Sequence, residues 1–270
     1  MNLDALSPSH WNPVDWSIVG PALVAGLLVL STHVPLGQRV LRKGIVFIDL
    51  AIAQIAGLGV IAAGALGWAD DGWAVQGAAV LAALLGAGLL TWMERRWPDI
   101  QEALIGALFV LASCVGILLL AGNPHGGEHL KDLLVGQILW VRPDQLWGMA
   151  ALSAVVLGVW FGAQRWLGQA GFYLLFAVAV TASVQLVGVY LVFSSLIMPA
   201  LAVRLVPLRW QLPLAWLAGA LAYALGLCVS AMLDWPSGAV VVLAMAGVCV
   251  LTAWVVPRAL PSSQRANPSE

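Results

Sequence analysis

Two ionisable side chains lie inside apolar stretches near the start of the chain, and together they could bind a cation. His33 lies six residues before Arg39, and Asp49 lies six residues after Lys43. At about 1.5 Å per helical residue, both would be roughly 9 Å from the same basic segment, on neighbouring antiparallel helices. An imidazole and a carboxylate suit a borderline divalent cation. A plain ion pair or hydrogen bond between the two helices explains them equally well.

Gln54 is a third polar candidate, further along the second apolar stretch. It follows Asp49 by five residues, which places the two side chains about 140° apart around a helix. Gln54 would therefore line a pathway only if Asp49 faced a different neighbour. A hydrogen bond to another helix is the simpler role for this amide.

A cluster of metal-binding residue types follows the fourth apolar stretch. His125, Glu128 and His129 supply the atoms that bind zinc or manganese, at i, i+3 and i, i+4 spacings. Gly126 and Gly127 between them favour a loop over a helix. The segment could attract metal at the outer mouth of a pathway, but a solvated polar loop accounts for it more simply.

The elements that must position these residues are membrane-spanning helices. Hydrophobic residues make up 61% of the 270 and charged residues only 9%, against about 25% charged in soluble domains. Trp, which favours membrane interfaces, occurs 14 times. The candidate spans are residues 17–34, 45–66, 74–93, 103–121, 146–163, 171–187, 189–203, 212–232 and 239–256. We therefore expect an all-α, polytopic transmembrane helix bundle of about eight to nine spans.

The cationic residues predict the orientation of this bundle, because cytoplasmic loops are rich in Lys and Arg. With the N-terminus outside the cytoplasm, only Lys131 and Arg142 fall on the outer side. The ten that fall inside are Arg39, Arg42, Lys43, Arg95, Arg96, Arg165, Arg204, Arg209, Arg258 and Arg265. This pattern predicts an extracytoplasmic tail over residues 1–16, a transmembrane domain over 17–256 and a cytoplasmic tail over 257–270.

Residues 171–203 form an unusual apolar stretch. As one straight helix, these 33 residues would extend about 50 Å, which is too long for one crossing and too short for two. Gly188 lies in the middle, among several Ser and Thr residues. Irregular backbone at membrane depth persists only where protein or a water-filled cavity surrounds it. We therefore expect two short helices that meet near Gly188, buried in the bundle, with one tilted span as the alternative.

Several other classes of function are not supported by the composition and motifs. A net charge of −1 leaves no basic surface for nucleic acid. Neither His-Glu-x-x-His nor Gly-x-Ser-x-Gly occurs. We expect no catalytic residues and no bound cofactor. Cys114, Cys228 and Cys249 all lie in apolar runs, where they would act as small packing residues.

Five segments, in order along the chain, resemble the zinc, manganese and iron permease family of ABC-type metal importers. They are Val34-Pro-Leu-Gly-Gln-Arg-Val-Leu-Arg-Lys43, the stretch from Asp49 to Val60, Leu134-Val-Gly-Gln-Ile-Leu-Trp-Val-Arg-Pro-Asp-Gln-Leu146, Val187-Gly-Val-Tyr-Leu-Val-Phe-Ser-Ser-Leu-Ile-Met-Pro-Ala200 and Asp234-Trp-Pro-Ser-Gly238. The first looks like the family's Pro-Leu-Gly turn and basic loop. The fourth is the closest match.

The resemblance implies a multi-pass subunit of the bacterial inner membrane. It would work as a homodimer surrounded by membrane lipid, with cytoplasmic ATPase subunits that bind ATP and a periplasmic metal-binding protein that delivers zinc, manganese or iron. The subunit itself would perform no chemistry.

The chain departs from this family in two places. The family has Asp-x-x-x-His in its second span, whereas here Gln54 stands at the His position and Asp49 is one residue before the Asp position. The metal contact has therefore moved, for example to His33 and Asp49, or the substrate is not a bare metal ion.

The second departure is the cytoplasmic loop at 164–169, which is shorter than the family's ATPase-docking loop. Docking would then fall to two other loops, which carry Arg95 and Arg96, and Arg204 and Arg209.

Two rival functions remain. One is a self-sufficient secondary carrier or channel for a small cation, coupled to protons through Asp49. The other is a scaffolding subunit with no pathway. A proton relay needs a chain of ionisable groups, and intramembrane charge is sparse in this sequence.

Overall fold

The computed structural model describes residues 14–65, 73–120, 138–163 and 168–259. All regular elements in these ranges are helices. They are α1 (Trp16–Lys43), α2 (Ile48–Ala65), α3 (Trp73–Arg96), η3 (Pro98–Ile100), α4 (Gln101–Leu120), η4 (Ile138–Trp140), α6 (Pro143–Gly162), α7 (Gln169–Val187), α8 (Val189–Ala202), α9 (Leu208–Leu233) and α10 (Ser237–Ala259). The predicted all-α class is therefore confirmed.

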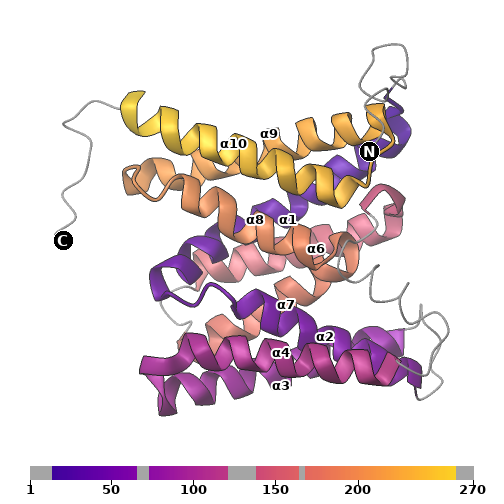
Figure 1. The fold of residues 1–270 in the computed structure, drawn as a ribbon, viewed down its shortest axis with the longest axis vertical. Coiled ribbons are helices and arrows are strands. Elements are labelled where there is room, and N and C mark those ends of the chain that lie inside the picture. The colour runs from indigo at the N-terminus through magenta and orange to yellow at the C-terminus, as the bar shows by residue number, and fades with distance from the viewer. Residues whose placement is uncertain (1–13, 66–72, 121–137, 164–167, 260–270) are drawn as a thin grey trace.

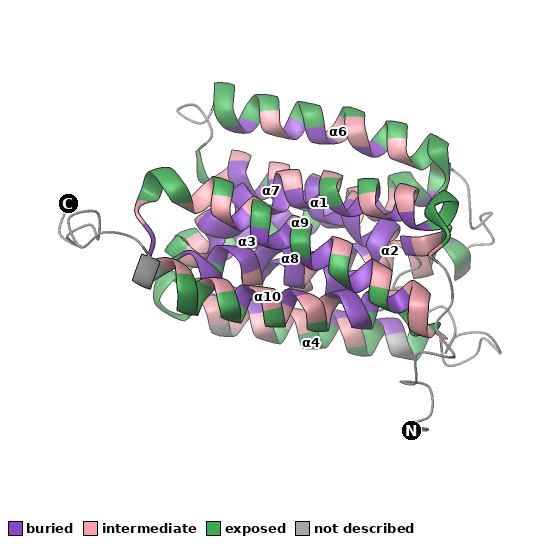
Figure 2. Ribbon diagram, turned by 90° about the horizontal axis from the view of Figure 1, so that it is seen from above, coloured by how far each residue is buried: buried purple, intermediate pink, exposed green. Residues whose placement is uncertain are grey.

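The helices have the length and composition that a bilayer requires. Among the described residues, six are long and apolar enough to cross, namely α1, α3, α6, α7, α9 and α10, and α2, α4 and α8 contain shorter apolar segments. Many large apolar side chains are exposed on the outer helices, which suits a surface that contacts lipid. Figure 2 shows buried residues concentrated on α1, α7 and α8, with α6 along one flank. The predicted polytopic bundle is confirmed, while the number of spans stays a prediction.

Helix α1 extends further than the sequence predicted. The Asp15 carboxylate accepts a hydrogen bond from the Ser17 N–H at the start of the helix, and Gly44, with a left-handed φ of 73°, ends it. Pro35 lies within the helix, so the predicted end at Val34 and the predicted Pro-Leu-Gly turn were wrong. A proline is tolerated in a transmembrane helix when neighbouring groups satisfy the backbone it frees.

The stretch at 171–203 is interrupted as predicted. Helix α7 ends at Val187, α8 begins at Val189, and Gly188 between them has φ 84° and ψ 161°. This backbone region is open almost exclusively to glycine. The break excludes one continuous helix over this stretch. All three residues are buried, as expected for irregular backbone in the bundle.

The helices form two groups that pack mainly within themselves. In the first helix group, α2 packs against α3 and α4, and α7 packs chiefly against α3. In the second helix group, α1 packs against α6, α8 and α9, and α10 packs against α8 and α9. Figure 1 shows the first group below the second, with α7 at the upper side of the first group. The order of the helices takes the chain from one group to the other four times, between α1 and α2, α4 and α6, α6 and α7, and α7 and α8 at Gly188.

Close backbone approaches reinforce each group. A Cβ atom on Gly37 of α1 would collide with the backbone carbonyl of Leu196 in α8, within the second group. In the first group, a Cβ on Gly59 of α2 would lie 2.7 Å from the Ala78 carbonyl oxygen of α3. Small residues that let helices touch are the usual packing device in membranes. Each group is thus tightly packed internally.

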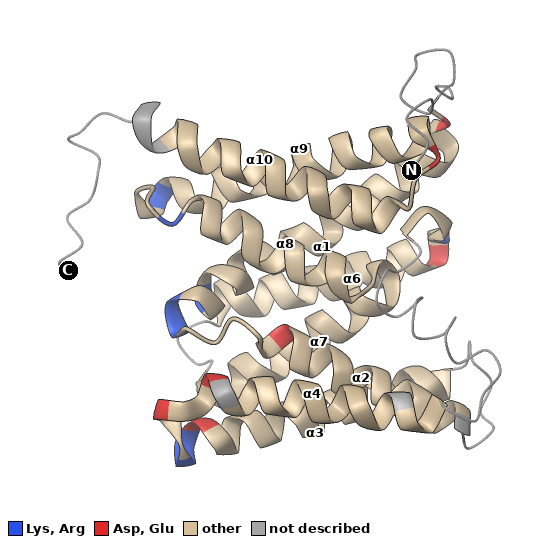
Figure 3. Ribbon diagram, in the orientation of Figure 1, with Lys and Arg blue, Asp and Glu red and all other residues tan. Residues whose placement is uncertain are grey.

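Charged residues separate the two ends of the bundle. Figure 3 shows most described Lys and Arg residues gathered at one end, at the termini of α1 and α3 and between α8 and α9. At the other end, Arg142 donates to Asp144 over 2.7 Å. The positive-inside rule predicts that this basic end faces the cytoplasm. The predicted tails at 1–16 and 257–270 lie largely outside the described residues.

Candidate functional site: unpartnered polar groups in the helix bundle

His33 is buried in α1 and has one ring nitrogen unused. Its Nδ1 lies 2.9 Å from the Val29 carbonyl oxygen and 3.0 Å from the Thr32 hydroxyl. Because a carbonyl can only accept, Nδ1 carries the proton of that hydrogen bond. Nε2 is fully buried and has no partner among the described residues. An imidazole held through Nδ1–H to a backbone carbonyl, with Nε2 left open, is the arrangement of metal-binding histidines.

Asp49 is a second buried group with an unsatisfied atom. It lies in the first turn of α2 and is 1% exposed. Its Oδ1 has no hydrogen-bond partner in the described part of the chain. The amino end of α2 favours a negative charge. A buried carboxyl oxygen without a partner is nevertheless costly, so the position suits a bound cation or a proton.

The structure does not join His33 to Asp49 by a hydrogen bond or an ion pair, although both residues are fully described. His33 and Arg39 lie six residues apart on the same helix, because α1 continues through Pro35, so His33 is about 9 Å along the helix from the first residue of the basic segment. The two side chains come from different helix groups, α1 and α2.

Gln54 lines a small cavity beside the break in the α7–α8 stretch. Ser113 of α4 shares the lining, and so do Val184 and Val189, which flank Gly188. The volume is about 20 Å³, enough for one water-sized group. Gln54 therefore faces a space where the two helix groups meet. The simpler role suggested by the sequence, a hydrogen bond to another helix, does not predict this position.

Two hydroxyls on α7 belong to the same class of unused polar group. Thr181 and Ser183 are buried, and neither oxygen has a partner among the described residues. In contrast, the Ser195 hydroxyl of α8 lies 2.9 Å from the Tyr223 hydroxyl. The number of Ser and Thr residues around Gly188 marked this region in the sequence. The sequence does not show which of their hydroxyls have hydrogen-bond partners.

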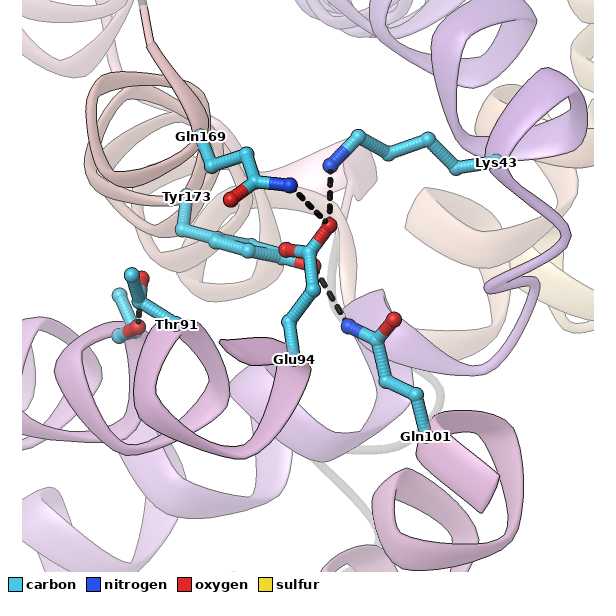
Figure 4. Close-up of polar contacts among 7 residues, drawn as sticks. Lys43, Thr91, Glu94, Gln101, Gln169 and Tyr173 are labelled. Carbon is cyan, nitrogen blue, oxygen red and sulfur yellow. Dashed lines mark hydrogen bonds and ion pairs between the residues drawn. The ribbon is translucent and has the colours of Figure 1, made fainter. Parts of the chain in front are cut away.

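A polar cluster at the basic end was missed by reasoning from the sequence. Glu94 Oε1 accepts hydrogen bonds from Lys43 Nζ and from Gln169 Nε2, each at 2.9 Å. Beside it, Gln101 Nε2 donates to the Tyr173 hydroxyl at 2.7 Å. These side chains belong to α1, α3, α4 and α7, and Figure 4 shows them pointing toward one another. Glu94 stands beside Arg95 and Arg96 in the sequence, which concealed its pairing with a lysine 51 residues away.

The predicted docking residues are all exposed. Arg95 and Arg96 belong to an exposed run at 95–100 between α3 and α4. The Arg96 guanidinium lies over the Trp97 ring, 5.6 Å from its centroid. Arg204 and Arg209 are exposed between α8 and α9, at the same end of the bundle. Both pairs of arginines are thus accessible at the basic end of the bundle.

The predicted metal-attracting loop, His125, Glu128 and His129, lies outside the described residues. Within the ranges that are described, no three or more His, Cys, Asp and Glu side chains gather to hold a metal ion. The strongest candidates for ligands are therefore the isolated groups of His33 and Asp49.

Comparison with known proteins places this architecture in a family. Residues 15–169 and 167–256 match the model of the ABC 3 transport family. The manganese transport system membrane protein MntC of Halalkalibacterium halodurans is 25% identical over 266 residues, covering 91% of this chain and 89% of that protein. A probable metal transport system membrane protein of Chlamydia pneumoniae is 24% identical over 255 residues, covering 84% of this chain and 85% of that protein.

Solved structures show the same fold. PsaBC from Streptococcus pneumoniae, in complex with a Fab, superposes with a TM-score of 0.72 at 21% identity, over 90% of this chain and 94% of that one. An inward-facing putative metal-chelate type ABC transporter gives 0.63 at 18% identity, over 87% and 85%. The predicted resemblance is confirmed: the chain is a multi-pass protein of the bacterial inner membrane, and it belongs to the ABC 3 transport family.

Proposed function

We propose that the chain is the membrane-spanning permease subunit of an ATP-driven importer for a divalent metal ion, with zinc or manganese as substrate and iron as a further candidate. The observation that carries the proposal is the open Nε2 of buried His33 together with the unpartnered Oδ1 of buried Asp49. In a bundle of the ABC 3 transport family, such groups are expected on a pathway. The names of the relatives, which refer to manganese and to metal transport, support the same substrate class.

A sparse ligand set suits a permease better than a storage site. Transport requires binding that is strong enough to admit the ion and weak enough to release it. One imidazole and one carboxylate, with Gln54 as a neutral neighbour, would hold a cation only briefly. Because His33 and Asp49 belong to different helix groups, relative movement of the groups would change their joint affinity for the ion.

The proposed partners follow from the family. A cytoplasmic ATPase would dock on the exposed Arg95–Arg96 and Arg204–Arg209 loops and hydrolyse ATP there. A periplasmic metal-binding protein would deliver the ion at the opposite end. Two copies of the permease would form the pathway within the lipid bilayer. The chain itself would be a transport subunit and no enzyme.

Metal uptake by a deletion strain tests the proposal. Cells that carry the wild-type gene should accumulate zinc or manganese, measured by mass spectrometry of washed cells, and Asp49→Asn and His33→Gln should each abolish that uptake. Thr91→Val is the matched control, because Thr91 is also buried but its hydroxyl donates to Ala87 of its own helix. Uptake by both site variants at the wild-type level, with equal expression, would refute the assignment.

The rival secondary carrier is separated by a second arm of this experiment. An inactivating substitution in the nucleotide site of the partner ATPase should stop uptake if the chain is an ATP-driven permease. Uptake that continues without ATP hydrolysis, and collapses when the proton gradient is dissipated, would favour the proton-coupled carrier.

A further inference from the structure

We propose that the Lys43–Glu94 pair is a releasable latch that ties the two helix groups together at the cytoplasmic end, and that it opens during transport. This inference rests on the proposed function for its role in the transport cycle. The tie itself is argued from the packing and the contacts alone.

The pair crosses the boundary between the groups. Lys43 is the last residue of α1, in the second helix group, and Glu94 lies near the end of α3, in the first. The other hydrogen bonds between side chains of different helices described above stay within one group: Gln101 to Tyr173, Gln169 to Glu94, and Ser195 to Tyr223. Among these hydrogen bonds between side chains, the Lys43–Glu94 contact is therefore the one that joins the two groups.

The environment of Lys43 makes the contact stronger than an ordinary surface pair. The Lys43 and Glu94 side chains are only 19% and 12% exposed, so water screens their attraction weakly. The ammonium group also lies 5.4 Å from the Phe172 ring centroid and 5.1 Å from that of Tyr173, within the range of cation–π attraction. All of these partners of Lys43 lie on α3 and α7, so the end of α1 is held by the first group.

A second carboxylate, that of Glu102, holds the α2 end of the connection between α1 and α2. Phe47, directly before α2, donates its N–H to Glu102 Oε1 at the start of α4, over 3.3 Å. This contact lies within the first helix group and supplies an acceptor to the amino end of α2. The connection between α1 and α2 is thus held at its α1 end by Glu94, through Lys43, and at its α2 end by Glu102, through Phe47. Of these two contacts, the one made by Glu94 joins the two helix groups, so it is the one that must break when the groups separate.

The latch would connect the predicted docking loop to the pathway. Glu94 and Glu102 flank the exposed run at 95–100, which we propose as an ATPase contact. Movement of that run would pull on Lys43 through Glu94. At the other side it would pull, through Phe47, on the first turn of α2, which contains Asp49. Opening the latch would therefore change the position of one candidate ligand relative to the other.

Distance measurements between spin labels test the tie without requiring transport. Labels would be attached at Arg96→Cys and Arg204→Cys, one in each group, in purified full-length protein with Cys114, Cys228 and Cys249 replaced by serine. Adding Lys43→Met should broaden or lengthen the distance distribution. The charge swap Lys43→Glu with Glu94→Lys should restore it. Labels at Arg42→Cys and Arg204→Cys, both in the second group, serve as the control and should not respond.

A reversible crosslink tests the role in transport. A bis-methanethiosulfonate reagent would join Lys43→Cys to Glu94→Cys in cells, and uptake should stop until a reductant cleaves the link. Phe47→Cys joined to Glu102→Cys should leave uptake unchanged by the link. An unaltered label distance in Lys43→Met would overturn the tie, and uptake through the linked latch would overturn its opening. Failure of wild-type uptake would instead reject the proposed function and leave the distance result standing.

Discussion

At the basic end of the bundle, Glu94 accepts hydrogen bonds from Lys43 and Gln169, and Gln101 donates to Tyr173. In the bundle interior, Asp49 Oδ1 and the hydroxyls of Thr181 and Ser183 have no partner among the described residues, and His33 is bonded through Nδ1 alone. Unpartnered polar atoms cost more inside a membrane bundle than at its edge. At the end of the bundle, Glu94 Oε2 and Glu102 Oε2 also have no partner among the described residues, but each carboxylate is held through its other oxygen. The interior groups that are held less completely are the ones that we propose for a passing ligand.

The two helix groups sharpen this contrast. The candidate ligands His33 and Asp49 belong to different groups, as do Lys43 and Glu94 at the end. The boundary between the two helix groups therefore has a hydrogen-bonded ion pair, Lys43–Glu94, at the basic end. In the interior it has polar atoms of His33 and Asp49 without a partner among the described residues. Rocking of one helical unit against another around a central site is a common transport movement. In this protein, substitutions should therefore be aimed at the contacts between the two helix groups.

The largest effect is expected from Glu94→Ala. Removing the carboxylate leaves the partly buried ammonium of Lys43 and the amide of Gln169 without their acceptor, which should cost about 3–5 kcal/mol of stability. The loss should appear as a lower melting temperature of the detergent-solubilised protein, followed by size-exclusion chromatography after heating. Glu94→Ala that melts with the wild type would show that the end cluster is not structural.

A smaller effect is expected from Gly188→Ala. The positive φ of 84° at Gly188 disfavours any side chain, at a cost of about 1–3 kcal/mol if the break is kept. Gly158→Ala in α6 is the control, since an added Cβ there meets no atom within 4 Å. Equal melting temperatures for the two variants would mean that the α7–α8 break does not require glycine.

The smallest effect is expected from Thr181→Val. The hydroxyl has no hydrogen-bond partner in the described part of the chain, so exchange for a methyl group of the same shape should leave the melting temperature unchanged or raise it slightly. Tyr173→Phe, which removes the acceptor of Gln101, should instead lower it, by the equivalent of about 1 kcal/mol. Destabilisation of Thr181→Val beyond that of Tyr173→Phe would reverse the comparison between the two regions.

The sequence predicted the features that depend on local composition. Apolar length located the helices, the density of Lys and Arg separated the two ends, and Gly188 among small polar residues marked the break. It misplaced the end of α1, because Pro35 was interpreted as a turn, whereas a membrane helix can continue through proline when its neighbours compensate.

Features that depend on distant pairing could not be predicted. The Lys43–Glu94 contact joins residues 51 apart, and nothing local to Glu94 identifies its partner. The division into two helix groups likewise follows from packing between helices that are far apart in the chain. His33 and Asp49 were found because ionisable residues in apolar stretches are rare, but their separate placement on the two groups required the structure.

Direct binding of metal to the purified permease tests the central claim, that the interior polar groups of His33 and Asp49 serve the transported ion. Equilibrium dialysis against radioactive zinc and, separately, manganese would compare the wild type with His33→Gln, Asp49→Asn and the Thr91→Val control. The account predicts that the wild type and the control bind one of the two metals and that both site variants lose this binding while remaining monodisperse. Undiminished binding by both site variants would contradict it.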